Sequence, residues 1–404
     1  MIEINKHKYT FPKILTFGFL IVIFMGTILL SLPFATRPGE TTNFMTAFFT
    51  STSATCVTGL TLVSTAHHWT LFGQIVIAIL MEVGGLGFMT FAVMMSLLVR
   101  QRMRMSTRLL TQEALNLDHL SQLNVVYLII RLSLLIQLAG GIFLFFDFYP
   151  RYGLGKGIWF SIFHSISAFC NAGFDLMGAK TPYSSLTYFV DNPVINFVIM
   201  SLIIIGGIGF MSWDDIKVNK HHVRKYRMQS KVILITTVLL ISLPALYFFL
   251  FEFGDKPMGE RIWSSLFQSV TPRTAGFNTA DVTLISETGT AITIMLMLIG
   301  GSPGSTAGGM KTTTLAVLFS TAISVFRRRE HTHFFGRRVN DDTIRNAATI
   351  LMMYVILFLT GGFLISHIES LPLLTCLYET ASAIGTVGLT LGITPNLGIA
   401  SQII

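Results

Sequence analysis

Long and short apolar stretches alternate along the chain. A transmembrane helix needs roughly 20 apolar residues, and seven stretches reach that length. They lie at about 14–35, 70–99, 123–149, 193–213, 232–253, 289–326 and 346–366. The pattern predicts an all-α polytopic membrane protein with seven spans.

Four further apolar segments are too short to cross a bilayer: Asn43–Thr58, Ile158–Ala172, Ile262–Ala275 and Leu371–Val387. A short helix can enter a membrane and return if protein or an aqueous cavity shelters its backbone groups. We expect each of the four to be a re-entrant helix on the same side of the membrane.

Each short segment ends in a related octet, and these octets are called the glycine segments below. They read SATCVTGL, SAFCNAGF, VTPRTAGF and SAIGTVGL, with the glycine at position seven being Gly59, Gly173, Gly276 and Gly388. The following spans also share motifs, with GGLGFM starting at Gly84, GGIGFM at Gly206 and an altered GGSPG at Gly300. Two kinds of segment that recur in one order indicate internal repeats.

The sequence therefore predicts four tandem helix–pore-loop–helix repeats in a pseudo-fourfold arrangement around one pore. Their expected boundaries are 1–110, 111–225, 226–335 and 336–404. The fourth repeat stops soon after its glycine segment, so its last helix is expected to be missing from this sequence.

Charge sets the expected orientation of the chain. Only 12% of residues are charged, against about 25% in soluble domains. Nineteen of the 28 lysines and arginines gather in the N-terminal tail and at 100–108, 217–231 and 327–345. Such loops stay on the cytoplasmic side, which predicts a cytoplasmic N-terminus and glycine segments facing outward. The positive charges thus orient the chain, and we expect no nucleic-acid partner.

The glycine segments suit cation binding. A dehydrated cation needs oxygen ligands in place of water, and backbone carbonyls supply them when the chain runs extended along a pore. Glycine allows the backbone angles that turn carbonyls inward. We expect such a cation to be held by eight carbonyls, those of Val57, Thr58, Asn171, Ala172, Thr274, Ala275, Thr386 and Val387.

Thr386-Val387-Gly388 resembles the filter core of potassium channels, and the whole chain resembles the Trk/Ktr/HKT superfamily of potassium transporters. The closest resemblance is to the membrane subunit of the bacterial Ktr system. It implies a potassium-selective filter, because serine replaces the first glycine in sodium-permeable members. The implied filter residues are Val57, Thr58, Gly59, Leu60, Asn171, Ala172, Gly173, Phe174, Thr274, Ala275, Gly276, Phe277, Thr386, Val387, Gly388 and Leu389.

The same resemblance implies a homodimer in the bacterial plasma membrane and a cytosolic nucleotide-binding regulatory ring. The ring would dock on the basic loops, and any nucleotide would bind to it. No cofactor is expected on this chain, and K⁺ is the transported ion.

A run of glycine and serine interrupts the sixth span, where proline and glycine leave helix groups unpaired. We call residues 300–311 the glycine-serine loop. Its family counterpart is an intramembrane gate below the filter; a fixed kink is the simpler alternative. The predicted gate residues are Gly300, Gly301, Ser302, Pro303, Gly304, Ser305, Thr306, Ala307, Gly308, Gly309 and Lys311. The loop imitates a phosphate-binding loop, but its lysine comes one place late and no strand precedes it.

Several ionisable residues lie in apolar sequence, where charges usually face protein or water. Glu82 and Arg131 are interpreted as structural partners, His164 as a packing residue, and Arg273 as a brace for the third glycine segment. We expect Lys311 to repel or pair near the cavity, and Glu379 also lies at membrane depth.

Three functions remain open at this point. The first is passive potassium translocation gated by a partner. The second is the potassium-binding subunit of an ATP-driven pump. The third, a membrane enzyme acting on a lipid, lacks acid/base pairs and a metal motif, so the chain is not expected to be an enzyme.

Overall fold

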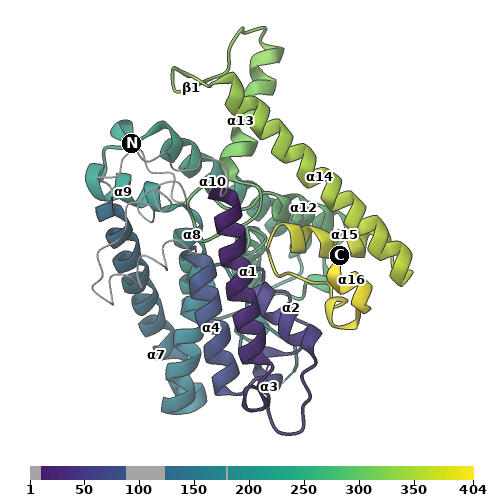
Figure 1. Ribbon diagram of the computed structural model, residues 1–404. Coiled ribbons are helices and arrows are strands. Elements are labelled where there is room, and N and C mark those ends of the chain that lie inside the picture. Colours follow the sequence, from purple (N-terminus) through teal and green to yellow (C-terminus); the bar gives the residue numbers. More distant parts are fainter. Residues whose placement is uncertain (1–10, 88–122, 179–180) are drawn as a thin grey trace, which may run out of the picture.

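A computed structural model describes residues 11–87, 123–178 and 181–404. Within these ranges the protein is helical apart from one small hairpin (Figure 1). The α-helices are α1 Phe11–Leu30, α2 Phe44–Thr55, α3 Thr65–His68, α4 Leu71–Gly85, α7 Leu123–Phe169, α8 Pro193–Gly207, α9 Phe210–Asn219, α10 Met228–Tyr247, α11 Met258–Val270, α12 Glu287–Leu298, α13 Thr312–Phe326, α14 Asp341–Glu369, α15 Leu373–Ile384 and α16 Ile399–Ile403. The hairpin pairs β1 (His333–Phe334) with β2 (Arg337–Arg338).

Short helical turns complete the described chain. The 3-10 turns are η1 Pro33–Ala35, η3 Thr187–Phe189, η4 Val223–Lys225, η6 Val282–Leu284 and η7 Thr394–Asn396. A π-helical turn, η5 Phe248–Glu252, extends α10.

Three of the predicted re-entrant segments are separate helices, α2, α11 and α15, and the fourth is the last part of α7. Each separate short helix packs against two other helices: α2 against α1 and α4, α11 against α10 and α8, and α15 against α14 and α12. Protein therefore shelters these short helices, while the four-repeat organisation stays a prediction.

Helix α7 joins a predicted span, 123–149, to the predicted re-entrant segment 158–172. It is broken at Gly153, whose φ of 75° is left-handed, three residues after Pro150. The rings of Phe148 and His164 lie 5.7 Å apart across this break. A continuous helix would separate them by about 24 Å at 1.5 Å per residue, so the chain folds back on itself at Gly153.

Two predicted spans are broken in the structure; the break in 193–213 corrects the sequence prediction, whereas the interruption of 289–326 was predicted. The stretch 193–213 is divided between α8 and α9, which meet at 96°, with Gly209 between them at φ 97°. The stretch 289–326 is divided into α12 and α13 by the glycine-serine loop. Glycine-rich breaks leave backbone groups for other segments to pair with.

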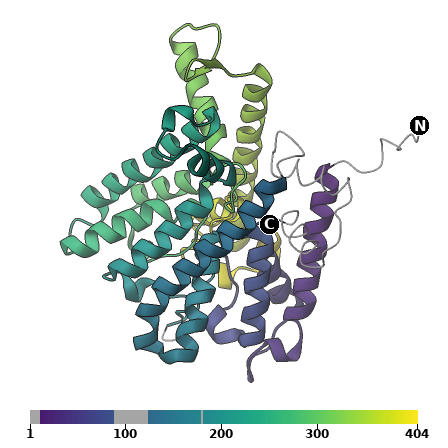
Figure 2. The same cartoon turned by 90° about the vertical axis from the view of Figure 1, so that its left-hand side faces the viewer.

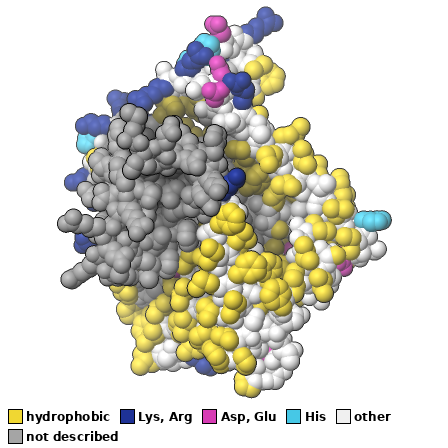
Figure 3. Space-filling view, viewed as in Figure 1, with side chains coloured by type: hydrophobic (Ala, Val, Ile, Leu, Met, Phe, Trp, Pro, Cys, Tyr) yellow, Lys and Arg dark blue, Asp and Glu magenta, His cyan; other side chains and the backbone are white. Residues whose placement is uncertain are grey.

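Among the described residues, three helices are long and apolar enough to cross a membrane, or four if the bent pair α8–α9 counts as one span. Five shorter apolar helices of 10–17 residues accompany them. Large apolar side chains are exposed along the outer faces of α1, α7, α10 and α14, and one such surface is seen in Figure 3. The count of seven spans stays a prediction, and the cluster at 100–108 lies outside the described residues.

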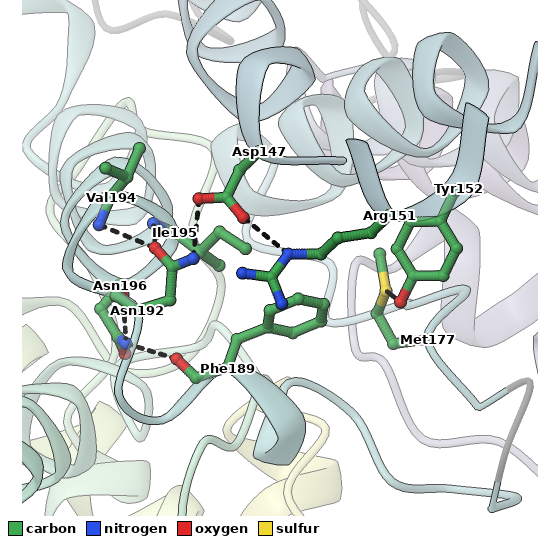
Figure 4. A network of polar contacts seen from close by, with 9 residues as sticks. All are labelled: Asp147, Arg151, Tyr152, Met177, Phe189, Asn192, Val194, Ile195 and Asn196. Carbon is green, nitrogen blue, oxygen red and sulfur yellow. Dashed lines mark hydrogen bonds and ion pairs between the residues drawn. The ribbon is translucent and has the colours of Figure 1, made fainter. Parts of the chain in front are cut away.

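A polar network ties the turn of α7 to the start of α8 (Figure 4). Asp147 forms an ion pair with Arg151 at 3.0 Å and accepts a hydrogen bond from Asn192 Nδ2 at 2.7 Å. Asn192 also caps α8, accepting from the backbone N–H groups of Val194 and Ile195. These bonds fix the two helices that flank the second glycine segment.

Candidate functional site

The four glycines of the glycine segments lie next to one another in a closed ring. The Cβ position of each glycine points at the carbonyl oxygen that precedes the next glycine, and the last points back to the first. The separations are 2.6 Å from Gly59 to Ala172, 2.9 Å from Gly173 to Ala275, 2.4 Å from Gly276 to Val387 and 2.5 Å from Gly388 to Thr58. Any side chain at these positions would enter the ring.

The backbone follows the same course in all four segments. Each glycine has a left-handed φ, between 72° and 92°, and so has the residue two places earlier: Val57, Asn171, Thr274 and Thr386, between 50° and 66°. The residue between them is not left-handed. This alternation of hand turns successive carbonyls toward one side, whereas a uniform strand points them to opposite sides. Left-handed residues with side chains cost about 1–3 kcal/mol each and cluster at functional sites.

Hydroxyl groups at the ends of the short helices hold this backbone. Ser53 Oγ accepts from the N–H of Gly59 at 3.1 Å, and Ser382 Oγ accepts from Gly388 at 3.0 Å. Ser167 instead donates to the carbonyl of Phe174 at 2.7 Å. In the third segment Val270 replaces the serine, and Thr271 donates to the carbonyl of Phe277.

These hydroxyl residues were missed as site residues in the sequence, although serine opens three of the four octets. The position of the three serines, six residues before the glycine, is the signal that could have identified them. The short helices also end next to the ring, so the partial negative charge of a helix C-terminus lies close to it.

A cavity lies over the ring, and all four glycines line it. Its one acidic residue among the described lining is Asp175, two places after Gly173. Met177 N–H donates to Asp175 Oδ1 at 2.9 Å, and this hydrogen bond holds the carboxylate in the cavity wall. The sequence did not single out Asp175, because one acidic residue forms no recognisable pattern.

The glycine-serine loop lies against the glycine segments. Thr306 Oγ1 donates to the carbonyl of Phe169, at the end of α7, at 2.9 Å. A Cβ on Gly308 would lie 1.9 Å from Thr386 Oγ1, so the loop backbone directly contacts the fourth segment. The predicted gate residues are thus brought beside the second and fourth segments.

The break between α8 and α9 receives the same loop. The N–H groups of Ser302 and Thr306 donate to the carbonyls of Gly207 and Gly206 at 3.0 and 3.2 Å, and Phe210 N–H donates to Gly304 at 2.7 Å. The two breaks therefore satisfy each other's unpaired backbone groups, which would be costly in a membrane interior.

Lys311 closes the loop on itself. Its Nζ donates to the carbonyl of Ala307 at 2.6 Å and to that of Gly308 at 3.3 Å. Lys311 was expected to repel or pair near the cavity. In the structure it pairs with backbone carbonyls of its own loop and with no carboxylate among the described residues. The ammonium fixes the part of the loop that touches Thr386.

Of the other ionisable residues, Glu82 pairs differently from the prediction. It accepts from Gln137 Nε2 at 2.9 Å and from the Cys170 thiol at 3.3 Å, while Arg131 is exposed. The two were predicted as partners because both lie in apolar sequence, but the amide of Gln137 reaches the carboxylate instead.

Glu379, in α15, accepts from the hydroxyls of Thr390 and Thr394 just beyond the fourth glycine segment. His164 is a packing residue, as predicted: its Nε2 accepts from Leu176 N–H at 3.2 Å, and its Nδ1 pairs with the carbonyl of Phe160. Arg273 is buried and points to Thr237 of α10, at 3.5 Å.

Among the described residues, no three His, Cys, Asp or Glu side chains lie close enough together to hold a metal ion. Four backbone carbonyl oxygens, those of Thr58, Ala172, Ala275 and Val387, lie against the four glycines of the ring.

Comparison with known proteins gives a consistent answer. The family model described as "TrkH: Cation transport protein" matches residues 13–404. The potassium/sodium uptake protein NtpJ of Enterococcus hirae is 39% identical over 97% of this chain and 88% of its own length. The Ktr system potassium uptake protein B of Bacillus subtilis is 37% identical over 98% of this chain and 89% of its own.

The fold has a solved counterpart. The crystal structure of the potassium transporter TrkH from Vibrio parahaemolyticus matches with a TM-score of 0.75, at 19% identity, over 100% of this chain and 82% of that one. A family model that spans nearly the whole chain settles the matter: this protein belongs to the TrkH family of cation transport proteins and is a transporter rather than an enzyme.

Proposed function

We propose that the protein is the ion-translocating membrane subunit of a bacterial potassium uptake system. The observation that carries this proposal is the closed ring of four glycines, in which each Cβ position faces the carbonyl before the next glycine. Rings of carbonyls replace the hydration shell of a dehydrated cation. Conduction is then channel-like, through a filter built from the four glycine segments.

The filter proposal rests on four equivalent strands. Left-handed backbone at the same two positions in each segment supports a pseudo-fourfold arrangement of four helix–pore-loop–helix repeats. The ligands are the eight carbonyls that precede the glycines by one and two places, as predicted from the sequence. Glycine at all four positions favours potassium, while the relative NtpJ is described as a potassium/sodium uptake protein.

The glycine-serine loop is proposed as the gate. Its contacts with Phe169 and Thr386 lie at the inner ends of the second and fourth segments. The Lys311 bonds hold the loop in this place, and a regulator that loosened it would open the path.

The assembly is part of the same proposal. We propose a homodimer, with one pore per subunit, controlled by a cytosolic nucleotide-binding ring. The relative from Bacillus subtilis is described as protein B of a Ktr system, which supports the presence of a partner protein. The nucleotide would bind to the ring, and this chain would carry K⁺ as cargo.

The decisive experiment is rubidium uptake into proteoliposomes that contain the purified protein and no ATP. We expect uptake driven by an inward Rb⁺ gradient, inhibited by excess K⁺ more strongly than by Na⁺. Uptake that appears only with an added ATPase subunit would support the pump instead, and absence of transport under both conditions would refute both functions.

Asp175 provides a separate prediction about cation entry. Its carboxylate lines the cavity over the ring, and a negative charge at a pore mouth raises the local cation concentration. Asp175→Asn should raise the KM for Rb⁺ uptake roughly 5-fold, the effect of about 1 kcal/mol from one charge. Glu40→Gln is the matched control, because Glu40 is an exposed acid outside that cavity. Equal KM values for both variants would rule out this role of Asp175.

A further inference from the structure

Four cations surround a pocket at the end of the molecule that carries the β1–β2 hairpin. They are Arg224, Lys225, Lys231 and Arg337, and the aromatic rings of Tyr226 and Phe335 complete the wall. The pocket lies between the start of α10 and the hairpin, at the end where the view in Figure 3 shows dark blue side chains gathered. Figure 2 shows the hairpin end projecting beyond the rest of the helices.

The pocket wall is held in place by contacts within it. Lys231 Nζ donates to the carbonyl of Arg224 at 2.7 Å and lies 5.8 Å from the centre of the Phe335 ring. The hydroxyl of Tyr226, a buried residue, donates to the carbonyl of Lys220 at 2.6 Å. The hairpin and the start of α10 are thereby joined, so the pocket is preformed.

The positive charge of the pocket is not neutralised by the described carboxylates. Nearby acids have other partners: Asp214 and Asp215 lie 3.1 and 3.8 Å from Arg227, and Asp341 lies 3.1 Å from Arg338. No ion pair within the described chain involves any of the four pocket cations. Like charges held together repel each other, and a bound anion relieves that repulsion.

Helix α10 forms one wall of the pocket and continues away from it. Met228, its first residue, lies in the pocket wall. Asp215 Oδ2 already accepts from the N–H of Arg227 and from Ser230 Oγ at this helix start, so the attraction for an anion comes from the four cations. Further along, α10 exposes apolar side chains, among them Ile235, Val238 and Leu239.

We propose that this pocket binds the phosphate group of an anionic phospholipid, whose acyl chains lie along the exposed apolar face of α10. A cationic pocket at the end of a spanning helix fits such a headgroup. The apolar face that continues from the pocket favours a lipid over free phosphate, which would gain nothing from it. This inference does not depend on conduction through the glycine segments.

The test is native mass spectrometry of the purified full chain in detergent, with phosphatidylglycerol or phosphatidylcholine added. The pocket variant is Arg224→Gln/Lys231→Gln/Arg337→Gln, and Arg337→Gln alone is a milder change on the exposed hairpin. The control is Arg327→Gln/Arg328→Gln/Arg329→Gln, which removes three exposed cations outside the pocket. We expect phosphatidylglycerol affinity to fall on the order of 100-fold in the triple pocket variant and roughly 5-fold in Arg337→Gln, at about 1 kcal/mol per cation.

The control variant should keep the affinity of the unchanged protein, and phosphatidylcholine should bind no variant preferentially. Equal phosphatidylglycerol affinity in all proteins would overturn the proposal. Inorganic phosphate is then added as a competitor. If it does not displace bound phosphatidylglycerol, the lipid is the ligand of the pocket. If it binds as tightly as the lipid, the pocket belongs to a free anion. A second binding measurement uses the regulatory subunit in place of lipid. If the triple pocket variant binds the lipid normally but no longer binds the regulatory subunit, the pocket is a docking site for that subunit and the lipid proposal is wrong.

Discussion

Gly276→Ala should abolish rubidium uptake, lowering its rate at least about 100-fold. A Cβ at this position would lie 2.4 Å from the carbonyl oxygen of Val387 and 3.2 Å from Gly388 Cα, both of them backbone atoms. Neither can move without displacing a neighbouring segment. The residue is also left-handed, at φ 77°, which costs a residue with a side chain about 1–2 kcal/mol. The measurement is initial Rb⁺ uptake in proteoliposomes at matched protein content.

Gly392→Ala separates the clash from the strain. Gly392 has a similar φ of 88°, but no atom lies within 4 Å of its Cβ position. The Gly392→Ala variant should therefore keep most of the Rb⁺ uptake, although it bears the same cost of a left-handed φ. Gel filtration of both variants checks that each is folded. Full uptake by folded Gly276→Ala would show that the ring is not needed, and equal loss in the two folded variants would show that the clash with Val387 is not the cause.

Lys311→Met should raise unregulated uptake about 5-fold or more. The substitution removes the two hydrogen bonds from Nζ to the carbonyls of Ala307 and Gly308, each worth about 1.5–3 kcal/mol when the donor is charged. The loop would then rest against Thr386 less often. The measurement is Rb⁺ uptake without any regulatory subunit.

Ser305→Ala is the matched control for the loop. Ser305 Oγ donates to the carbonyl of Ser302 at 2.7 Å and so loses a bond inside the loop, away from the contact with Thr386. Its uptake should stay close to that of the unchanged protein. An unchanged or lower rate in Lys311→Met would argue that the loop is a fixed kink and not a gate.

The glycine segments could be predicted because their signal is repeated. One Gly-Leu pair says little, but Gly59, Gly173, Gly276 and Gly388 follow segments of similar length and sequence. The structure brings all four together, though their spacing exceeds 100 residues. The repetition of the segment therefore allowed contacts between distant glycines to be predicted, which one segment alone would not allow.

The bend between α8 and α9 and the long-range contacts of the glycine-serine loop could not be predicted from the sequence. Hydropathy measures composition, and the residues before Gly209 are composed like those of a straight span, yet α8 and α9 meet there at 96°. The turn at Gly153 is different, because it falls between the predicted span 123–149 and the predicted re-entrant segment 158–172. The bonds of the glycine-serine loop to Phe169 and Gly206 link residues about 100 or more places apart. Only the fold decides which unpaired carbonyls meet.

The third glycine segment shows how a local change is absorbed. It has Val270 where the others have serine, and Pro272, which has no N–H to donate. The N–H of Ala275 therefore reaches the carbonyl four residues back, on Thr271, whereas the equivalent N–H groups of Thr58, Ala172 and Val387 reach five residues back. The Thr271 hydroxyl takes over the bond to the strand, and the glycine keeps its place in the ring.

Binding of a cation inside the ring formed by the four glycine segments can be observed in a crystal. The most direct measurement is anomalous X-ray scattering from crystals of the protein soaked in rubidium chloride. We expect a rubidium peak on the ring axis, coordinated by the carbonyls of Thr58, Ala172, Ala275 and Val387. A ring without any peak, in crystals that show rubidium elsewhere in the protein, would contradict it.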